Sequence, residues 1–261
     1  MRLDRFLSEI GIGTRKNIKQ LIKAGRISVD GEIAKSSDMK IDEKTAMVTF
    51  DGKPLQYREY EYYMLHKPAG VVSATEDRAH KTVIDLITET KRKDLFPVGR
   101  LDIDTEGLLL ITNDGDMAHR LLAPDKHVDK CYMAYIRGEL TGEDIRRFET
   151  GIDIGEDGEE QITALAALRV IRTLDPSDVE LVMYMHSDTA INAGADDECF
   201  LEVEVTIHEG KYHQIKRMFA ALGKEVVYLK RLSMGSLRLD EKLVKGEYRR
   251  LTDEEINNLK K

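Results

Sequence analysis

The chain has 261 residues, of which 41% are hydrophobic and 34% are charged, and its formal net charge is −8. A chain of this length can bury a substantial core in one to three domains. It contains no apolar run near the ~20 residues that a membrane-spanning helix needs and no signal-peptide segment, so we expect a cytoplasmic protein without a membrane partner. Cys131 and Cys199 are too far apart to form a CxxC metal pair or a disulfide framework.

The acidic average hides a basic N-terminal segment. Residues 1–26 hold seven basic and two acidic side chains, a net charge of +5. The local potential steers a polyanion more strongly than the total charge does. The chain can therefore still bind RNA.

Two short helices are predicted at the N-terminus. Apolar residues at i, i+3, i+4 and i+7 from Leu3 indicate an amphipathic helix that ends at Gly11. Thr14 is expected to cap a second helix that buries Ile18. Short strands are expected at 26–30, 32–34 and 47–50, and a polar linker is expected at 56–61.

The predicted second helix carries lysines on one outward face. A row of this kind is often only a solvated surface. Here, however, two short helices followed by Arg26-Ile-Ser-Val-Asp-Gly resemble the S4 RNA-binding module over roughly residues 1–50. The resemblance implies that the basic face binds structured RNA through Arg15, Lys16, Lys19, Lys23 and Arg26.

The rest of the chain alternates strands and helices without a Gly-rich phosphate loop. Residues 186–198 are polar and rich in Gly, Asn and Asp, which predicts a long hairpin loop. The alternating apolar patterns favour a mixed or antiparallel sheet over a doubly wound one. The predicted strands are 62–65, 108–111, 131–136, 179–185 and 201–207.

Three carboxylates alternate at Asp102, Asp104 and Glu106, followed by Gly107. A calcium loop would need a bidentate carboxylate at its twelfth position, which is Asn113. A phosphatase nucleophile would follow an apolar strand, whereas the apolar run here comes after the acids. Both interpretations are disfavoured.

Acids at a strand entrance facing water explain Asp104 and Glu106 well. They explain Asp102 less well, since it lies between Leu101 and Ile103, where an ionised carboxylate needs a basic partner. The remaining hypothesis is a single nucleophilic aspartate, Asp102.

Several motifs in one order support that hypothesis. Residues 99–115 read GRLDIDTEGLLLITNDG, and they resemble the signature of the pseudouridine synthases of the small-subunit ribosomal RNA (RsuA-type) family. The family pattern continues with MLHKPAG at 64–70, HRLLAP at 119–124 through His127 to KCY at 130–132, EGKYHQIKRMFAALG at 209–223 and GEYRRLT at 246–252. With the S4-like segment, the resemblance covers nearly the whole chain except residues 140–200.

The resemblance implies isomerisation of a uridine within RNA, with no cofactor and no metal. Asp102 matches the essential aspartate of the family, as nucleophile or base. Tyr132 would stack on the flipped base, Ile215 would cover the uracil, and Arg100 would contact phosphate or help to extrude the base.

Helical spacing suggests which cation accompanies Asp102. Ile215 begins an i, i+3, i+4, i+7 apolar stripe. Lys216 lies roughly 100° from Ile215 around the helix and can lean toward a pocket, whereas Arg217 lies nearly opposite and is expected to face solvent or RNA. Lys67, His213 and Gln214 are further candidates for RNA contact or structural support. Thr105 and Gly107 are expected to shape the turn, the glycine by adopting a positive φ.

We therefore expect an α+β protein with an S4-like αα/β domain at 1–57 and a two-lobed catalytic domain with a mixed, mainly antiparallel sheet at 58–261. The partner would be ribosomal RNA or a ribosomal precursor particle, favouring the small-subunit 16S RNA, and the protein would be a monomer. Two alternatives stay open: a synthase for large-subunit 23S RNA, and a non-catalytic RNA-binding assembly factor.

Overall fold

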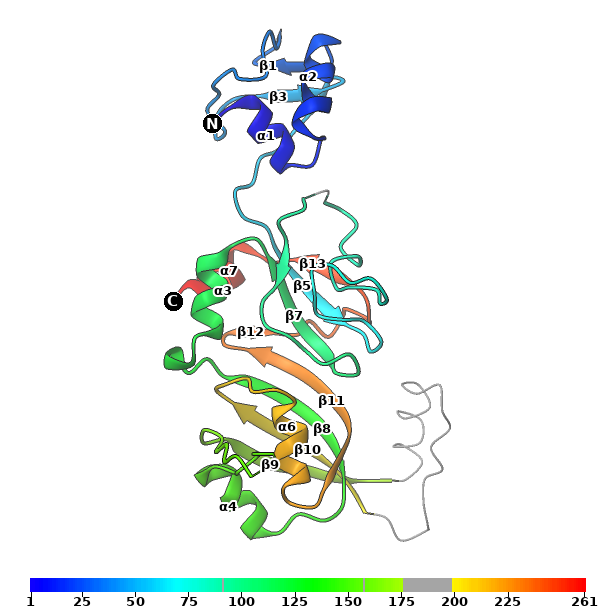
Figure 1. Cartoon of the computed structure of the whole chain (residues 1–261), viewed down its shortest axis with the longest axis vertical. Coiled ribbons are helices and arrows are strands. Elements are labelled where there is room, and N and C mark those ends of the chain that lie inside the picture. Colours follow the sequence, from blue (N-terminus) through cyan, green and yellow to red (C-terminus); the bar gives the residue numbers. More distant parts are fainter. Residues whose placement is uncertain (91, 157, 176–198) are drawn as a thin grey trace. The chain divides into compact units, whose positions relative to one another are not determined.

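A computed structural model describes residues 1–90, 92–156, 158–175 and 199–261 (Figure 1). The chain forms two compact units. The first comprises Met1–Glu61 and Ile87–Phe96, and the second comprises Tyr62–Leu86 and Pro97–Lys261. The predicted strand at 179–185 and the predicted loop at 186–198 lie outside the described residues. Among the described residues, none of the helices has the length and the apolar composition of a membrane-spanning segment.

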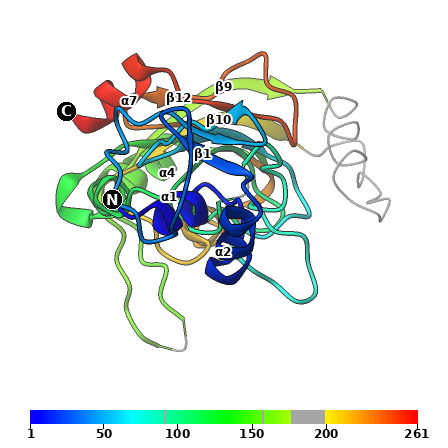
Figure 2. The same cartoon turned by 90° about the horizontal axis from the view of Figure 1, so that it is seen from above.

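Two helices lie side by side in the first unit, α1 (Leu3–Glu9) and α2 (Arg15–Lys23) (Figure 2). Leu3 and Ile18 are fully buried in their shared core. The Thr14 hydroxyl accepts the backbone N–H of Asn17 at 3.3 Å, which confirms the predicted N-cap. The predicted helices are therefore present.

A small antiparallel sheet completes the first unit in the order β2-β1-β3-β4. Its strands are β1 (Ile27–Val29), β2 (Glu32–Ile33), β3 (Val48–Phe50) and β4 (Lys53–Pro54). The expected linker is partly structured, because the Tyr57 ring stacks on Phe6 at 5.2 Å and its hydroxyl donates to Glu9 at 2.7 Å. The sequence pattern also did not indicate that residues 87–96 join this unit, where Arg92 donates to the carbonyl of Arg58 at 2.7 Å.

The second unit is built on one continuous sheet with the strand order β13-β5-β7-β11-β8-β10-β9. The strands are β5 (Tyr62–Lys67), β6 (Phe96–Pro97), β7 (Glu106–Thr112), β8 (Lys130–Arg137), β9 (Ala167–Leu174), β10 (Phe200–Ile207), β11 (Glu225–Met234), β12 (Leu237–Arg238) and β13 (Tyr248–Arg250). The helices are α3 (Gly115–Leu122), the 3-10 turn η1 (Pro124–Lys126), α4 (Gly142–Thr150), α6 (Gln214–Ala220) and α7 (Asp253–Lys260).

The sheet is mixed and mainly antiparallel, as predicted. Only one pairing along the described strand order is parallel, that of β7 with β11, where Lys230 pairs with Glu106 and Arg231 with Gly107. Strand β11 thereby joins the half of the sheet near α3 and α7 to the half near α4 and α6 (Figure 1). The α+β class is confirmed.

Gly107 is required where β7 approaches β11. Its φ is +101°, and a Cβ at this position would lie 2.2 Å from the backbone oxygen of Arg231. Any side chain would therefore push the two strands apart. The predicted positive φ is confirmed, and the close approach supplies a second reason for the glycine.

Candidate active site

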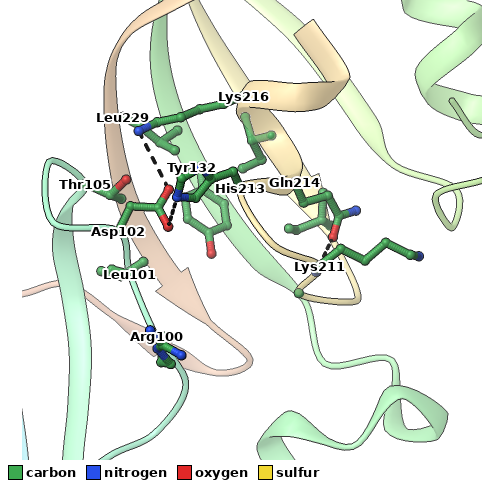
Figure 3. A pocket seen from close by; sticks show the side chains of 13 residues that line it. Arg100, Leu101, Asp102, Thr105, Tyr132, Lys211, His213, Gln214, Lys216 and Leu229 are labelled. Atoms are coloured by element: carbon green, nitrogen blue, oxygen red, sulfur yellow. Dashed lines mark hydrogen bonds and ion pairs between the residues drawn. The ribbon is translucent and has the colours of Figure 1, made fainter. Parts of the chain in front are cut away.

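Asp102 lies in the turn that leads into β7. The turn is closed by the backbone N–H of Thr105, which donates to the carbonyl of Asp102 at 3.1 Å. Two groups from the start of α6 face the carboxylate, His213 Nε2 at 3.5 Å from Oδ1 and Lys216 Nζ at 3.7 Å from Oδ2 (Figure 3). The predicted approach of Lys216 to Asp102 is therefore present in the structure.

Lys216 is closer to Asp104 than to Asp102. Its Nζ lies 2.6 Å from Oδ1 and 2.7 Å from Oδ2 of Asp104. An ammonium has three donors on a flexible stem, so it can serve two carboxylates. The prediction that Asp104 lies only at the strand entrance is wrong, because Asp104 competes for the cation of Asp102.

Glu106 does not face water, which corrects a second prediction. It is 1% exposed, accepts the hydroxyl of Tyr228 at 2.8 Å and pairs with Lys245 at 3.0 Å. Burial, followed by the hydrogen bond to Glu106, raises the pKa of Tyr228 above its ordinary value. The reason is the position of β7 inside the sheet, where all of its side chains are buried. In the described residues, no three carboxylate, histidine or cysteine side chains are arranged to hold a metal ion.

Tyr132 lies beside Asp102 and forms one wall of a small pocket of about 80 Å³ (Figure 3). Buried and partly exposed residues alternate along β8, and this alternation turns Tyr132 inward. Ile215 and Leu229 also line the pocket and are buried. The pocket thus joins an aromatic ring, two aliphatic side chains and a carboxylate.

A larger cavity of about 800 Å³ shares Asp102 and Tyr132 with the small pocket. Arg100 is exposed and lines both. Lys130 and Arg231 also line the larger cavity. The second unit therefore has a cavity next to Asp102 that is larger than the small pocket.

Lys67 is fully buried, so the expectation that it contacts RNA is wrong. Its Nζ donates to the carbonyls of Pro68 (3.0 Å), Ile103 (3.2 Å) and Thr105 (2.8 Å). Burial lowers its pKa to about 8. Its role is structural, because two of these carbonyls belong to the turn that carries Asp102.

The prediction that Arg217 faces solvent or RNA is wrong. Its guanidinium pairs with Glu156 at 3.1 Å, and it donates to the carbonyls of Tyr212, at 3.2 Å, and Ile154. These partners lie outside α6, so helical spacing alone did not reveal them. Arg217 braces the start of the helix and is not an exposed RNA contact.

The 209–214 segment holds two further predicted candidates, Gln214 and His213, and the aromatic residue Tyr212. Gln214 is buried and donates to Glu209 at 2.8 Å. His213 adopts a left-handed φ of 46°, and its ring stacks on Tyr212 at 3.8 Å. Tyr212 is 72% exposed and lines the larger cavity, a position that the sequence pattern did not indicate.

The basic residues predicted on the first unit are exposed. Arg26 pairs with Asp51 at 2.8 Å and lies over the ring of Phe50, 4.7 Å from its centroid. The exposed set is Arg15, Lys16, Lys19, Lys23 and Arg26.

Lys130 and Arg231 were not among the predicted site residues. Both lie on strands whose neighbouring inward positions are apolar or aromatic. The position of Lys130 could have been predicted, because the alternating pattern of β8 places Lys130 and Tyr132 on the same buried face. Arg231 gave no comparable signal, because the register shifts twice in the pairing of β11 with β8.

Comparisons with known proteins agree with this fold. The model of the RNA pseudouridylate synthase family matches residues 61–221, and that of the S4 domain matches residues 1–45. The chain therefore belongs to the RNA pseudouridylate synthase family, and it carries an N-terminal S4 domain. It is an RNA pseudouridine synthase, an isomerase of the RsuA-like group.

Its relatives cover nearly its whole length. It is 47% identical over 260 residues to the uncharacterized RNA pseudouridine synthase YtzG of Bacillus subtilis, covering 99% of this chain and 98% of the relative. It is 40% identical to the ribosomal small subunit pseudouridine synthase A of Vibrio cholerae, covering 99% of each. A crystal structure of a pseudouridylate synthase matches with a TM-score of 0.61 and 33% identity, covering 99% of both chains.

Proposed function

We propose that this enzyme converts a uridine of small-subunit 16S ribosomal RNA to pseudouridine. The observation that supports 16S RNA as the substrate is the full-length similarity to proteins named ribosomal small subunit pseudouridine synthase A, at 36–40% identity. Either free ribosomal RNA or a ribosomal precursor particle would be the partner.

Asp102 is the proposed nucleophile or base. The reaction breaks the N1–C1′ bond, turns the base and joins C1′ to C5, while C5 loses a proton and N1 gains one. Lys216 and His213 would hold the carboxylate in place next to the reacting sugar. Such a group has to be positioned before it is reactive, and the turn clamped by Lys67 provides that position.

The small pocket is the proposed seat of the uracil. Chemistry at C1′ and C5 requires the base to leave its stack. Tyr132 would stack on the flipped base, Ile215 would cover it, and Arg100 at the rim would contact the backbone. Stacking of this kind contributes about 1–3 kcal/mol per base.

The experiment measures tritium release from RNA labelled with [5-³H]uridine. The substrates are 16S RNA, 23S RNA and small-subunit precursor particles, each with the wild type and with Asp102→Asn. We expect release from 16S RNA or the particles that vanishes in Asp102→Asn. Release from 23S RNA alone would contradict the substrate, and binding without release would contradict the activity.

The basic face of α2 is the proposed docking surface for structured RNA. Replacing Lys16, Lys19 and Lys23 together by Gln should lower the slope of log affinity against log salt by about 2, since each lost phosphate contact removes about 0.7–0.9. The matched control replaces three exposed lysines of the same unit outside α2, which are Lys35, Lys44 and Lys53. An equal loss in both triple variants would refute a specific role for α2.

A further inference from the structure

Two buried cations line the larger cavity next to the uracil pocket. Arg231 is 2% exposed and Lys130 is 6% exposed. Their charges act on each other, because burial first and then the positive charge of Arg231 lower the pKa of Lys130. Bringing two like charges together away from water is unfavourable unless an anion compensates them.

Their polar atoms are only partly used within the protein. Arg231 donates from Nε to the carbonyl of Leu108 at 2.7 Å, and its Nη2 is buried without a hydrogen-bond partner. Lys130 Nζ donates to the carbonyl of Val128 at 3.2 Å. Within the part of the chain that the structure describes, neither cation forms an ion pair with a carboxylate.

The carboxylates nearest to Lys130 have other partners. Asp129 pairs with His208 at 2.7 Å, while Glu209 accepts from Gln214 and from the backbone of Ala164, each at 2.8 Å. Both carboxylates only moderate the local positive charge. Although Glu209 also lines the cavity, the wall formed by Arg231 and Lys130 keeps, among the described residues, one buried donor without a partner and two positive charges without an ion pair.

The fold places this wall beside the base-binding pocket. Arg231 is the cross-strand partner of Tyr132, and Lys130 lies two residues before Tyr132 on the same inward face of β8. An RNA strand whose base stacks on Tyr132 has its sugar near Asp102. Its adjoining phosphates are then within reach of the larger cavity, since they are covalently linked to that sugar and the cavity shares Asp102 and Tyr132 with the small pocket.

We propose that Arg231 and Lys130 form a phosphate subsite that binds a backbone phosphodiester flanking the target uridine. A guanidinium suits this role because its planar donors match phosphate oxygens. The identity of the phosphate as part of an RNA strand rests on the proposed function, whereas the anion site itself does not.

The first experiment needs no RNA. Thermal unfolding of the full chain is followed with increasing inorganic phosphate, with chloride holding the ionic strength constant. We expect a saturable rise in Tm for the wild type. Arg231→Met and Lys130→Met should weaken the apparent phosphate affinity about ten- to hundredfold, the effect of removing a charge-assisted hydrogen bond.

The control is Arg238→Met, an exposed arginine on β12 next to β11, which should respond to phosphate as the wild type does. If Arg231→Met does not fold, Lys130→Met and Arg231→Lys decide instead: the first should weaken the apparent phosphate affinity about ten- to hundredfold, and the second should weaken it less, because the charge is kept while the planar donors are lost. The absence of a phosphate-specific rise in the wild type, or an unchanged rise in the variants that fold, overturns the proposal.

The second experiment links the subsite to RNA. Single-turnover reactions use a substrate in which one phosphate flanking the target uridine is a neutral methylphosphonate. When the methylphosphonate replaces the phosphate that the subsite binds, the reaction of the wild type should slow about tenfold or more. The reaction of Arg231→Met or Lys130→Met should hardly slow further, because the methylphosphonate and the protein substitution remove the same contact.

If the methylphosphonate at every flanking position slows the variants by the same factor as the wild type, the assignment to an RNA phosphodiester is overturned, even if free phosphate binds. The two experiments also separate this proposal from the choice of substrate. If 16S RNA is not modified, the phosphate response of the free protein still supports or refutes the subsite.

Discussion

The ammonium of Lys216 lies 2.6 Å from a carboxylate oxygen of Asp104. The same ammonium is 3.7 Å from Asp102, so the cation beside the proposed catalytic carboxylate is shared. The two aspartates are therefore distinguishable by experiment, although they stand two residues apart in one motif.

We expect Asp102→Asn to abolish tritium release and Asp104→Asn to change it less than about fivefold. Asp104 is exposed, and an exposed ion pair contributes at most about 1 kcal/mol. The measurement is the single-turnover rate at saturating RNA for both variants. Equal inactivation by the two substitutions would show that the pair of aspartates acts as a unit.

Lys216→Met should lower that rate about ten- to hundredfold, because it leaves two neighbouring carboxylates without their shared cation. Lys216→Arg should restore part of the rate, since the charge is kept while the point contact is not. Lys242→Met removes an exposed lysine and is the control. A wild-type rate in Lys216→Met would rule out an electrostatic role.

Gly107→Ala should destabilise the second unit by roughly 3 kcal/mol or more. The new Cβ would meet the backbone of Arg231 at 2.2 Å in addition to the cost of a positive φ. Gly246→Ala is the matched control, because Gly246 has a φ of +87° with nothing within 4 Å of the added Cβ, and about 1 kcal/mol is expected. Urea unfolding measures both, and similar losses would mean that the close approach is relieved.

Lys67 should make stability rise with pH between about 8 and 10.5. Its pKa is lowered to about 8 in the folded chain from an ordinary value of 10.5, so in this range the unfolded chain binds the extra proton and the folded chain does not. The cost of holding the charge is present below pH 8 and is relieved as the pH rises, by an amount on the order of a few kcal/mol.

Thermal unfolding of the wild type and of Lys67→Met across this pH range tests the linkage. The wild type should gain stability relative to the variant as the pH rises. The variant should be less stable overall, since the carbonyls of Pro68, Ile103 and Thr105 lose their donor. A pH-independent difference between the two proteins would contradict the lowered pKa.

Local periodicity was enough to predict the elements whose faces are defined by their own residues. The spacing of Leu3 and its neighbours predicted α1, and the stripe that begins at Ile215 predicted α6, because each helix buries its own apolar face. The approach of Lys216 to Asp102 followed from the same stripe together with the family resemblance. Lys216 then proved to be shared with Asp104, which helical geometry does not reveal.

The surroundings of Glu106, Lys67 and Arg217 could not be predicted in this way. Each takes partners from a distant segment or from a carbonyl placed by the sheet register. Glu106 is buried because β7 lies between β5 and β11, and its partner Tyr228 is 122 residues away. A charged residue in the sequence shows no such partner, so solvent exposure was the default prediction.

The backbone of Arg231 is paired with Gly107 on one side and with Tyr132 on the other. Two strand spacings, about 10 Å, therefore separate the strand that follows Asp102 from the strand that presents the aromatic ring. This width is fixed by main-chain hydrogen bonds and does not depend on which side chains line the site. Substitutions in the pocket can thus change the side chains that line it while the spacing between the strand after Asp102 and the strand of Tyr132 is kept.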